Sequence, residues 1–392
     1  MGAAINHQQD FPPLQLDRID ARVFRVPVAE PVQTSFGIMY DRPAVLVRVE
    51  DREGCVGWGE VWCNFPEVGA EHRARMLETC VAPILLERSW AHPAEAFREA
   101  TRRLHILAIQ TGEPGTIAQA IAGADIALWD LLGKRLGQPL WQLLGGAPRV
   151  AVYASGLSPT GPEKLAAAKR AEGFTAFKLK VGFGAERDLD NLRALRALLG
   201  PDTTLMVDAN QAWEREAARE MSIRMADFRL EWLEEPMAAD VPLEDWKALA
   251  EASPIALAGG ENLRGEAAFS AALSSSAFSV IQPDLGKWGG FSGCLEVAKE
   301  AHRKGIRFCP HWLGGGIGLI ASMHLKAAAG GPGWVEVDSN PNPLRELLAV
   351  CPPVRDGSVE LSDLPGLGAE PDFERAEAFL VPHRYADAAK GK

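Results

Sequence analysis

The sequence of 392 residues predicts an α/β fold, in which a barrel of parallel strands follows a smaller α+β region. From residue 150 onward, short β-branched or aromatic runs alternate with helical stretches rich in Ala, Leu and Glu. Eight such runs occur, which is the strand number of a parallel barrel. Polar residues stand near the ends of seven runs, spaced 23 to 28 residues apart, about one strand–helix unit.

The composition argues against several classes of partner. A net charge of −11 disfavours binding to nucleic acid or to an anionic membrane, because both attract clustered Lys and Arg. No stretch of the sequence is long and apolar enough to span a bilayer, and the first residues lack a signal-peptide pattern. The six cysteines show no CxxC spacing. We therefore expect a soluble cytoplasmic protein without a disulfide framework or a zinc site.

The first 137 residues mix strand and helix patterns. Residues 18–28 and 44–61 alternate apolar and polar side chains, as half-buried strands do. A stretch punctuated by Gly and Pro, residues 30–43, separates them. Helical patterns follow from Gly69 to about Gly137. These patterns predict an α+β unit over residues 1–137.

The barrel region contains eight predicted strands joined by helices. They are residues 150–156, 176–182, 204–210, 230–236, 255–262, 278–284, 307–312 and 334–339. The carboxyl ends of parallel strands meet at one mouth of a barrel, so we expect the polar residues at these ends to converge there. These residues are Lys180, Asp208, Glu234, Glu261, Asp284, His311 and Glu336.

The second predicted strand directs two lysines to one face. Lys178 and Lys180 alternate with Phe177, Leu179 and Val181, and a period of two places both ammonium groups on the same side. We expect these cations to face the acidic residues of the neighbouring strands.

Three consecutive strands contribute acids: Asp208, Glu234 and Glu261. Three carboxylates brought together without neutralisation would repel one another and raise their pKa values. An all-oxygen set without Cys or His favours a hard divalent ion such as Mg²⁺. Each acid taken singly could instead be a helix N-cap or a surface salt-bridge partner. The shared position on successive strands favours the metal site.

With these motifs the chain resembles the enolase superfamily, and within it the mandelate racemase-like subgroup (mandelate racemase/muconate lactonizing enzyme family). The motifs that carry the resemblance are "FKLKVG", "VDAN", "WLEEP", "GGEN", "PDLGKWGG", "CPHW" and "WVEVD". The resemblance implies a modified TIM barrel, (β/α)7β, over residues 138–345, with residues 1–137 as an N-terminal α+β capping domain. It implies that residues 346–392, with "DLPGLG", return to the cap, and that the protein is a homo-oligomer.

The resemblance also implies a metal role for the acids. Mg²⁺ on Asp208, Glu234 and Glu261 would bind a substrate carboxylate and stabilise the enediolate formed when the α-proton leaves. The family's ligand is the first acid of "EEP", so Glu235 is expected to be a supporting residue. Lys178 would contact the substrate carboxylate.

Two bases are implied on opposite faces of the substrate. Lys180 would take the α-proton, with its pKa lowered by Lys178 and by the metal. His311 would act as acid or base, with Asp284 holding its tautomer. Glu336, if protonated, could donate a hydrogen bond to the enediolate oxygen.

The second base has an alternative candidate, and the predicted substrate contacts depend on position alone. Lys287 of "GKWGG" stands where dipeptide epimerase-like relatives carry their second base, so it competes with His311. The residues 28–40 and 60–65 are expected to reach the substrate pocket. The predicted substrate contacts are Asn210, Tyr40, Trp62 and Asn64. His324 lies in an apolar helical stretch and is expected to be a core residue.

Three functions remain open at this stage. The first is dehydration of a sugar acid or other hydroxy acid, the second is racemisation or epimerisation of a 2-hydroxy acid, and both use the same residues. The predicted pocket loops mix polar and apolar side chains and do not decide between them. The third is a catalytically silent structural or binding protein, which is disfavoured because every expected site position is filled.

Overall fold

The computed structural model describes residues 13–382. The predicted ends of the first and last units, residues 1–12 and 383–392, lie outside this range. The N-terminal elements form an antiparallel sheet in the order β1-β2-β3, covered by helices. We call these elements the cap. They are β1 (Leu16–Gln33), β2 (Ile38–Asp51), β3 (Val56–Val61), α1 (Gly69–Met76), the π-helical turn η1 (Leu77–Val81), α2 (Ala82–Leu86), α3 (Pro93–Thr111) and α4 (Pro114–Leu136).

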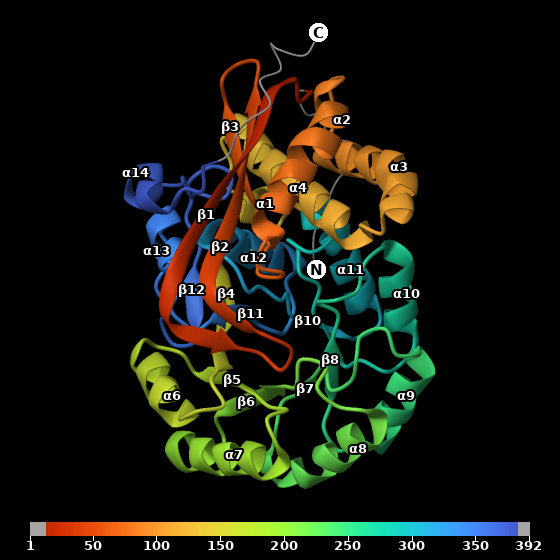
Figure 1. Cartoon of the computed structure of the whole chain (residues 1–392), viewed down its shortest axis with the longest axis vertical. Coiled ribbons are helices and arrows are strands. Elements are labelled where there is room, and N and C mark those ends of the chain that lie inside the picture. Colours follow the sequence, from red (N-terminus) through yellow and green to blue (C-terminus); the bar gives the residue numbers. More distant parts are fainter. Residues whose placement is uncertain (1–12, 383–392) are drawn as a thin grey trace.

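The cap sheet packs on α4 through glycine. A Cβ at Gly57 or Gly59 of β3 would collide with the backbone of α4, and a Cβ at Gly123 of α4 would collide with Val61. Close approach of the two backbones therefore requires glycine at these positions. Figure 1 shows the long β1–β2 hairpin beside the barrel, with α1–α4 gathered above it.

The second part is a curled parallel sheet whose strands alternate with helices, as the sequence predicted. The strand order is β10-β9-β8-β7-β6-β5-β4-β11. Its strands are β4 (Arg149–Leu157), β5 (Ala176–Lys180), β6 (Thr204–Asp208), β7 (Leu233–Glu234), β8 (Leu257–Gly259), β9 (Val280–Ile281), β10 (Arg307–Phe308) and β11 (Val335–Asp338). The helices between them are α6 (Pro162–Ala171), α7 (Ala185–Leu199), α8 (Arg215–Arg224), α9 (Leu243–Ala252), α10 (Glu266–Ser274), α11 (Gly290–Arg303) and α12 (Gly316–Ala329), with the short helices α5 (Leu140–Leu143) before β4 and η2 (Ala226–Phe228) after α8.

Seven of the eight barrel strands are shorter than the sequence runs that predicted them, and β7, β9 and β10 are the shortest. The regular ladders of β7, β9 and β10 contain two residues each. A proline follows two residues after each ladder, at Pro236, Pro283 and Pro310. Proline lacks a backbone N–H, so it cannot continue the ladder.

Buried Lys326 of α12 joins the two ends of the sheet. In residues 13–382 the ladder has no pairing between β10 and β11. The Lys326 Nζ donates to the carbonyl of Phe308 in β10 at 3.1 Å and to those of Gly330 and Pro332 at 2.9 and 3.0 Å. Burial lowers the pKa of Lys326 to about 8. These hydrogen bonds link β10 to the turn that leads into β11.

The last described residues contact both parts. They include α13 (Pro343–Leu348), β12 (Ser358–Glu360), α14 (Phe373–Ala376) and η3 (Glu377–Phe379), and β12 pairs with β4. Phe373 stacks on Phe24 of the cap at a centroid distance of 5.8 Å, and Val381 N donates to Val23 O at 2.8 Å. The return of this segment to the cap is thus seen in the structure, while the domain boundaries stay a prediction.

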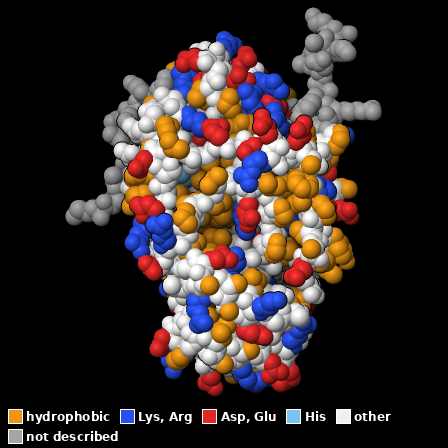
Figure 2. Space-filling view, turned by 90° about the vertical axis from the view of Figure 1, so that its left-hand side faces the viewer, with side chains coloured by type: hydrophobic (Ala, Val, Ile, Leu, Met, Phe, Trp, Pro, Cys, Tyr) orange, Lys and Arg blue, Asp and Glu red, His pale blue; other side chains and the backbone are white. Residues whose placement is uncertain are grey.

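The surface of the molecule agrees with its acidic composition. Figure 2 shows acidic and basic side chains interspersed over one face, with no continuous basic area among the described residues of that face. Among the described residues, no helix has both the length and the apolar character needed to cross a bilayer.

Candidate active site

A cavity of about 220 Å³ lies where the cap meets the carboxyl ends of the barrel strands. Both predicted cap loops reach it. The cap side supplies Thr34, Phe36, Trp62, Asn64 and Phe65, and the barrel side supplies Lys180, Asn210, Gln211, Glu261, Asn262, Lys287, His311 and Leu313. Tyr40 lies apart from this cavity. Its side chain is 68% exposed and lines a smaller neighbouring hollow with Asn64 and Phe65.

The strand register brings the site residues to one level. Lys180 is paired with Asp208, and Asp208 with Glu234, across β5, β6 and β7. Asp284 and His311 form an isolated parallel bridge. Since neighbouring parallel strands run in step, equal positions at their ends place these side chains beside one another.

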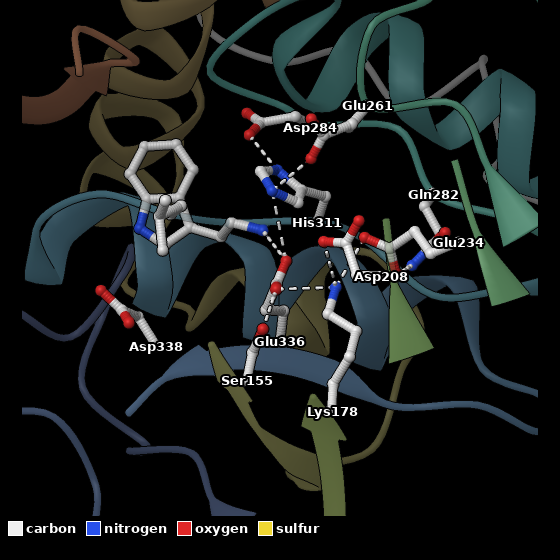
Figure 3. Close-up of polar contacts among 12 residues, drawn as sticks. Ser155, Lys178, Asp208, Glu234, Glu261, Gln282, Asp284, His311, Glu336 and Asp338 are labelled. Carbon is white, nitrogen blue, oxygen red and sulfur yellow. Dashed lines mark hydrogen bonds and ion pairs between the residues drawn. The ribbon is translucent and has the colours of Figure 1, made fainter. Parts of the chain in front are cut away.

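Lys178 lies below the cavity, with a fully buried side chain. Its Nζ is 2.6 Å from Glu234 Oε1 and 2.9 Å from Glu336 Oε1 (Figure 3). Burial would lower the pKa of Lys178, but the charges of Glu234 and Glu336 outweigh it and hold this pKa well above its usual value. Lys178 does not line the cavity, and its contact with the substrate carboxylate stays a prediction.

The predicted lowering of the Lys180 pKa depends on Lys178 and a bound metal together and stays a prediction, whereas the protein's own charges shift this pKa upward. The Lys180 Nζ is 2.5 Å from Asp208 Oδ2. Burial and the charge of Lys178 lower the pKa of Lys180, but the Asp208 carboxylate raises it further, and the net shift is upward. The ion pair with Asp208 decides the direction of the Lys180 pKa shift. The alternation of side chains along the strand does not reveal this ion pair.

The three predicted metal ligands have different surroundings. Asp208 Oδ1 accepts from Asn210 N at 2.8 Å, and Glu261 Oε1 accepts from Asn262 Nδ2 at 3.0 Å. Glu234 Oε2 accepts from Gln282 Nε2 at 2.7 Å and from Trp232 Nε1 at 3.1 Å. Burial opposes the charged form of all three. The charges of Lys180 and Lys178 nevertheless lower the pKa of Asp208, and the charges of His311 and Lys287 lower that of Glu261.

Burial instead dominates at Glu234 and raises its pKa to about 7, although Lys178 opposes the shift. The contacts of Gln282 and Trp232 with Glu234 were not predicted. Gln282 precedes Asp284 by two residues, which was the available signal for its position beside the site.

The charge balance of the site fits a divalent cation. Ion pairs join five carboxyl groups to Lys178, Lys180, Lys287 and His311. Glu235 lies next to Glu261 and adds a sixth carboxyl group. With all of these groups charged, the cluster carries an excess of two negative charges, which is reached only above about pH 8 because burial raises the pKa of Glu234 to about 7 and that of Glu235 to about 8. The donor set of Asp208, Glu234 and Glu261 consists of oxygens, which Mg²⁺ prefers.

The carboxylates are nevertheless not arranged as a finished metal site. Within residues 13–382, no three His, Cys, Asp or Glu side chains stand close enough to hold a metal ion. Each predicted ligand instead forms an ion pair with a basic side chain, and this side chain balances its negative charge. The residue types and the charge fit Mg²⁺, and the metal role stays a proposal.

His311 and Asp284 form the predicted pair. His311 Nδ1 is 2.6 Å from Asp284 Oδ2, and Nε2 is 2.5 Å from Glu261 Oε2 (Figure 3). Burial lowers the pKa of His311, but Glu261 and Glu336 outweigh it and hold this pKa well above its usual value. A charged imidazole carries a proton on each ring nitrogen, and here Nδ1 is hydrogen-bonded to Asp284 while Nε2 is in ion-pair contact with Glu261.

The conditional role of Glu336 as a protonated donor is not supported. Burial raises the pKa of Glu336, but Lys178 and His311 lower it, and the net shift is downward. A carboxylate has no proton to donate. Its Oε1 instead accepts from Ser155 Oγ, and its Oε2 accepts from Trp312 N at 3.2 Å.

Lys287 also lies at the cavity. Its Nζ is 3.2 Å from Glu261 Oε1 and 3.1 Å from Asn262 Oδ1. It stands 4.7 Å from the ring centre of Trp62, a favourable position for a cation. Geometry therefore keeps Lys287 available as the competing base.

The loops after β6 and β7 hold strained backbone. Asn210, Gln211 and Glu235 have φ values of 43°, 65° and 35°. Such values in residues other than glycine cluster at functional sites. The carbonyl of Asn210 accepts from Ser35 Oγ of the cap at 2.6 Å, and its side-chain Oδ1 has no partner within the described residues. Asn210 thus presents an acceptor at the cavity wall.

His324 is a core residue, as predicted. It is fully buried in α12, its Nδ1 accepts from Trp141 N at 2.9 Å, and its Nε2 lies 3.2 Å from Leu367 O. Both ring nitrogens are satisfied far from the cavity-lining residues.

Comparison with known proteins gives the family. Residues 18–145 match the model of the mandelate racemase/muconate lactonizing enzyme N-terminal domain, and residues 163–376 match that of the enolase C-terminal domain-like family. The chain is 35% identical to D-galactarolactone cycloisomerase of Agrobacterium fabrum, over 89% of this chain and 94% of the relative. It is 29% identical to arabinonate dehydratase of Saccharolobus solfataricus, over 83% of this chain and 87% of the relative.

Solved structures agree with this placement. A mandelate racemase/muconate lactonizing enzyme from Bordetella bronchiseptica is 52% identical, with a TM-score of 0.88, over 94% of this chain and 99% of that one. A racemase from Streptomyces coelicolor, solved with bound magnesium, is 31% identical, with a TM-score of 0.84, over 93% of this chain and 100% of that one. The protein is therefore an enzyme of the enolase superfamily, and it belongs to the mandelate racemase/muconate lactonizing enzyme family.

Proposed function

We propose that the protein is a Mg²⁺-dependent lyase that removes the α-proton of a sugar acid or other hydroxy acid and expels an oxygen from the β-carbon. The observation that carries this proposal is that Lys180 and His311 line one cavity together with Glu261. Proton removal beside a carboxylate needs a base and stabilisation of the developing charge. Expulsion of the oxygen needs an acid.

Asp208, Glu234 and Glu261 are the proposed magnesium ligands. When bound, Mg²⁺ would supply positive charge that stabilises the enediolate form of the substrate carboxylate. A cation on these carboxylates would also compensate the excess of two negative charges described above.

Lys180 is the proposed base. It can accept a proton only as a neutral amine, and in the structure Asp208 stabilises its ammonium form. Engagement of Asp208 as a metal ligand would remove this stabilisation. Lys178, already charged between Glu234 and Glu336, keeps a like charge near Lys180 and so favours the neutral form.

His311 is the proposed acid. Asp284 accepts from Nδ1, so the imidazolium proton on Nε2 is the one available to the departing oxygen. Loss of a hydroxyl would be dehydration. Loss of a ring oxygen would open a ring without loss of water, which is an isomerisation. Both outcomes use the same two residues.

The cavity wall supports a hydroxylated substrate. Four amide side chains, Asn64, Asn210, Gln211 and Asn262, line it beside Thr34. Amides and hydroxyls can donate to and accept from substrate hydroxyl groups. Relatives named for a sugar lactone and for arabinonate point to the same substrate class.

Racemisation or epimerisation is the second candidate, because Lys180 and His311 could exchange a proton from two faces of one carbon. The likeness to a solved racemase favours it.

A catalytically silent scaffold is a remote third candidate. We also infer a cytoplasmic homo-oligomer, and the six cysteines, all free in the structure, fit a reducing compartment.

A screen of acid sugars and simpler 2-hydroxy acids with Mg²⁺ tests the proposal. Formation of a 2-keto acid is expected, and it should stop when a chelator removes the metal. Uptake of solvent deuterium with inversion and without keto acid would establish the racemase instead. No turnover and no exchange with any of these acids would contradict both enzymatic proposals.

A further inference from the structure

Glu60 of the cap is buried against a barrel helix. The side chain is 1% exposed. Its Oε1 accepts from Gly315 N at 2.6 Å, and its Oε2 accepts from Gly318 N at 2.8 Å. Both amides belong to the N-terminus of α12, where unpaired N–H groups and the helix dipole favour an anion. In the part of the chain that the structure describes, Glu60 has no basic partner in an ion pair, so these amides are its main stabilising contacts.

The segment that Glu60 holds leads directly from His311. Trp312 follows His311, and its Nε1 donates to Gly315 O at 2.9 Å. The Trp312 ring fills a slot between Gly286, Gly314 and Gly318, where an added Cβ would collide with it. Gly286 comes two residues after Asp284. The contact of Glu60 with Gly315 therefore reaches His311 through Trp312.

The neighbours of Glu60 contact the same loops. Trp62 N donates to Gly286 O at 3.4 Å, and Asn64 Nδ2 donates to Leu313 O at 2.5 Å. These two contacts are neutral and each is a single hydrogen bond. Glu60 accepts two hydrogen bonds from backbone amides, twice as many as either neighbour makes here, although burial raises its pKa to about 7.

We propose that Glu60 is a positioning residue for the His311–Asp284 pair. Its carboxylate holds residues 313–318, and with them the Trp312 wedge, so that His311 Nε2 keeps its place at the cavity. The inference rests on the proposed function, because its effect is measured in the step that uses His311. It adds a cap residue that no sequence motif indicated.

The substitution Glu60→Gln tests the proposal. A glutamine of nearly equal size can accept from one amide, but its NH₂ group then faces the other N–H, so one hydrogen bond is lost. We expect keto-acid formation to fall about 10- to 100-fold, since small misplacement of a catalytic group has effects of that order. Solvent exchange of the α-proton through Lys180 should change by less than about 3-fold, and so should KM.

Two further variants make the test specific. Asp130→Asn alters another fully buried carboxylate that accepts from two backbone amides, Trp58 N at 2.7 Å and Leu367 N at 2.6 Å, between the cap and the C-terminal segment. It should lower Tm but leave the ratio of turnover to exchange unchanged. Gly315→Ala would push against the Glu60 carboxylate without removing its charge. It should reproduce the selective loss of turnover.

The outcomes separate the two proposals. Absence of any reaction in the unaltered enzyme would contradict the proposed function. An active enzyme in which Glu60→Gln and Gly315→Ala keep normal turnover would overturn the positioning role. So would a parallel loss of turnover and exchange, as expected for a general loss of structure. If Glu60→Gln does not fold, Gly315→Ala decides.

Discussion

At the scale of single residues, the site is a set of buried charges whose protonation states depend on their partners. Lys180 and His311 both line the cavity, and each is held in its charged form by a carboxylate at 2.5 Å. The same carboxylates, Asp208 and Glu261, are proposed metal ligands. A cation that binds them would therefore release Lys180 and His311 from these ion pairs.

Substitution of the proposed ligands tests the metal site. Asp208→Asn, Glu234→Gln and Glu261→Gln each remove one negative charge from the oxygen set. Titration calorimetry should show Mg²⁺ binding weakened by at least about 10-fold, since even outer-shell changes have roughly 10- to 100-fold effects. Turnover should be lost. Asp130→Asn, which lies outside the site, should bind Mg²⁺ normally. Full activity in all three ligand variants would contradict the assignment.

The two bases should be separable by substitution. His311→Asn is expected to abolish dehydration yet leave α-proton exchange through Lys180, and Lys180→Ala is expected to remove that exchange. Loss of a general acid or base lowers rates by about 10²- to 10⁴-fold, which is easily measured by keto-acid assay and deuterium uptake. In a racemase, each variant should keep exchange with one enantiomer.

Lys287→Ala is the informative comparison for this pair. If His311→Asn kept near-normal turnover while Lys287→Ala abolished turnover and exchange, Lys287 would be the second base. The Lys287 Nζ lies 3.2 Å from Glu261 Oε1, so Lys287 is close enough to the site for this alternative.

At the scale of elements, strand ends and helix N-termini do most of the positioning. The strands β5 to β7 bring Lys180, Asp208 and Glu234 to one level, and Glu261 follows the end of β8. Two carboxylates of the cap bind the N-termini of barrel helices. Asp125 of α4 accepts from Ser292 N at 3.0 Å at the start of α11, as Glu60 does at the start of α12. Both contacts use the preference of helix N-termini for anions.

The buried helix α12 should make stability depend on pH. Burial lowers the pKa of His324 to about 4, whereas the unfolded value is 6.5. Between these values the unfolded chain binds a proton that the folded chain does not. The contribution of His324 to the free energy of unfolding should therefore fall by about 3 kcal/mol as the pH drops from 6.5 to 4.

Urea unfolding of the enzyme and of His324→Gln at pH 7, 5 and 4 measures this effect. His324→Gln will be less stable at pH 7, because it loses fitted hydrogen bonds. The gap between the two proteins should narrow by about 3 kcal/mol toward pH 4. Parallel curves for the two proteins would show that His324 does not titrate in this way.

At the scale of the whole molecule, buried polar contacts fasten the cap to the barrel. Arg42 of β2 is fully buried, and its Nη2 donates to Asp338 Oδ2 of β11 at 2.6 Å. Burial raises the pKa of Asp338, but the charges of Arg42 and Arg345 lower it, and the net shift is downward. The ion pair joins residues that are 296 positions apart in the chain.

Breaking this pair should be costly. Asp338→Asn would leave the buried Arg42 without a carboxylate, and we expect denaturant unfolding to show a loss of about 3–5 kcal/mol. The exposed pair of Arg102 with Glu99 is the matched control, and Glu99→Gln should leave stability nearly unchanged. Equal small effects would mean that the buried pair does not fasten the cap.

By itself the sequence determined the class of fold and the location of the site. Alternation of strand and helix patterns, and the regular spacing of polar residues at strand ends, depend on local periodicity, which is visible in one chain. The eight strands were predicted correctly, and the structure also brings together the acids, the His311–Asp284 pair and the cap loops, whose roles stay predictions. Strand lengths were overestimated at seven strands, and prolines limit the ladders of β7, β9 and β10.

Only the tertiary structure decided which partner each side chain meets. Contacts between distant segments produce four features that the sequence did not show. They are the raised pKa of Lys180, the lowered pKa of Glu336, the hydrogen bond from Gln282 to Glu234, and the hydrogen bond from the N-terminus of α12 to Glu60. The energy of a charge pair depends on distance and burial, and these are set when the whole chain packs. A sequence shows which charges are present, whereas the packed structure fixes their protonation states.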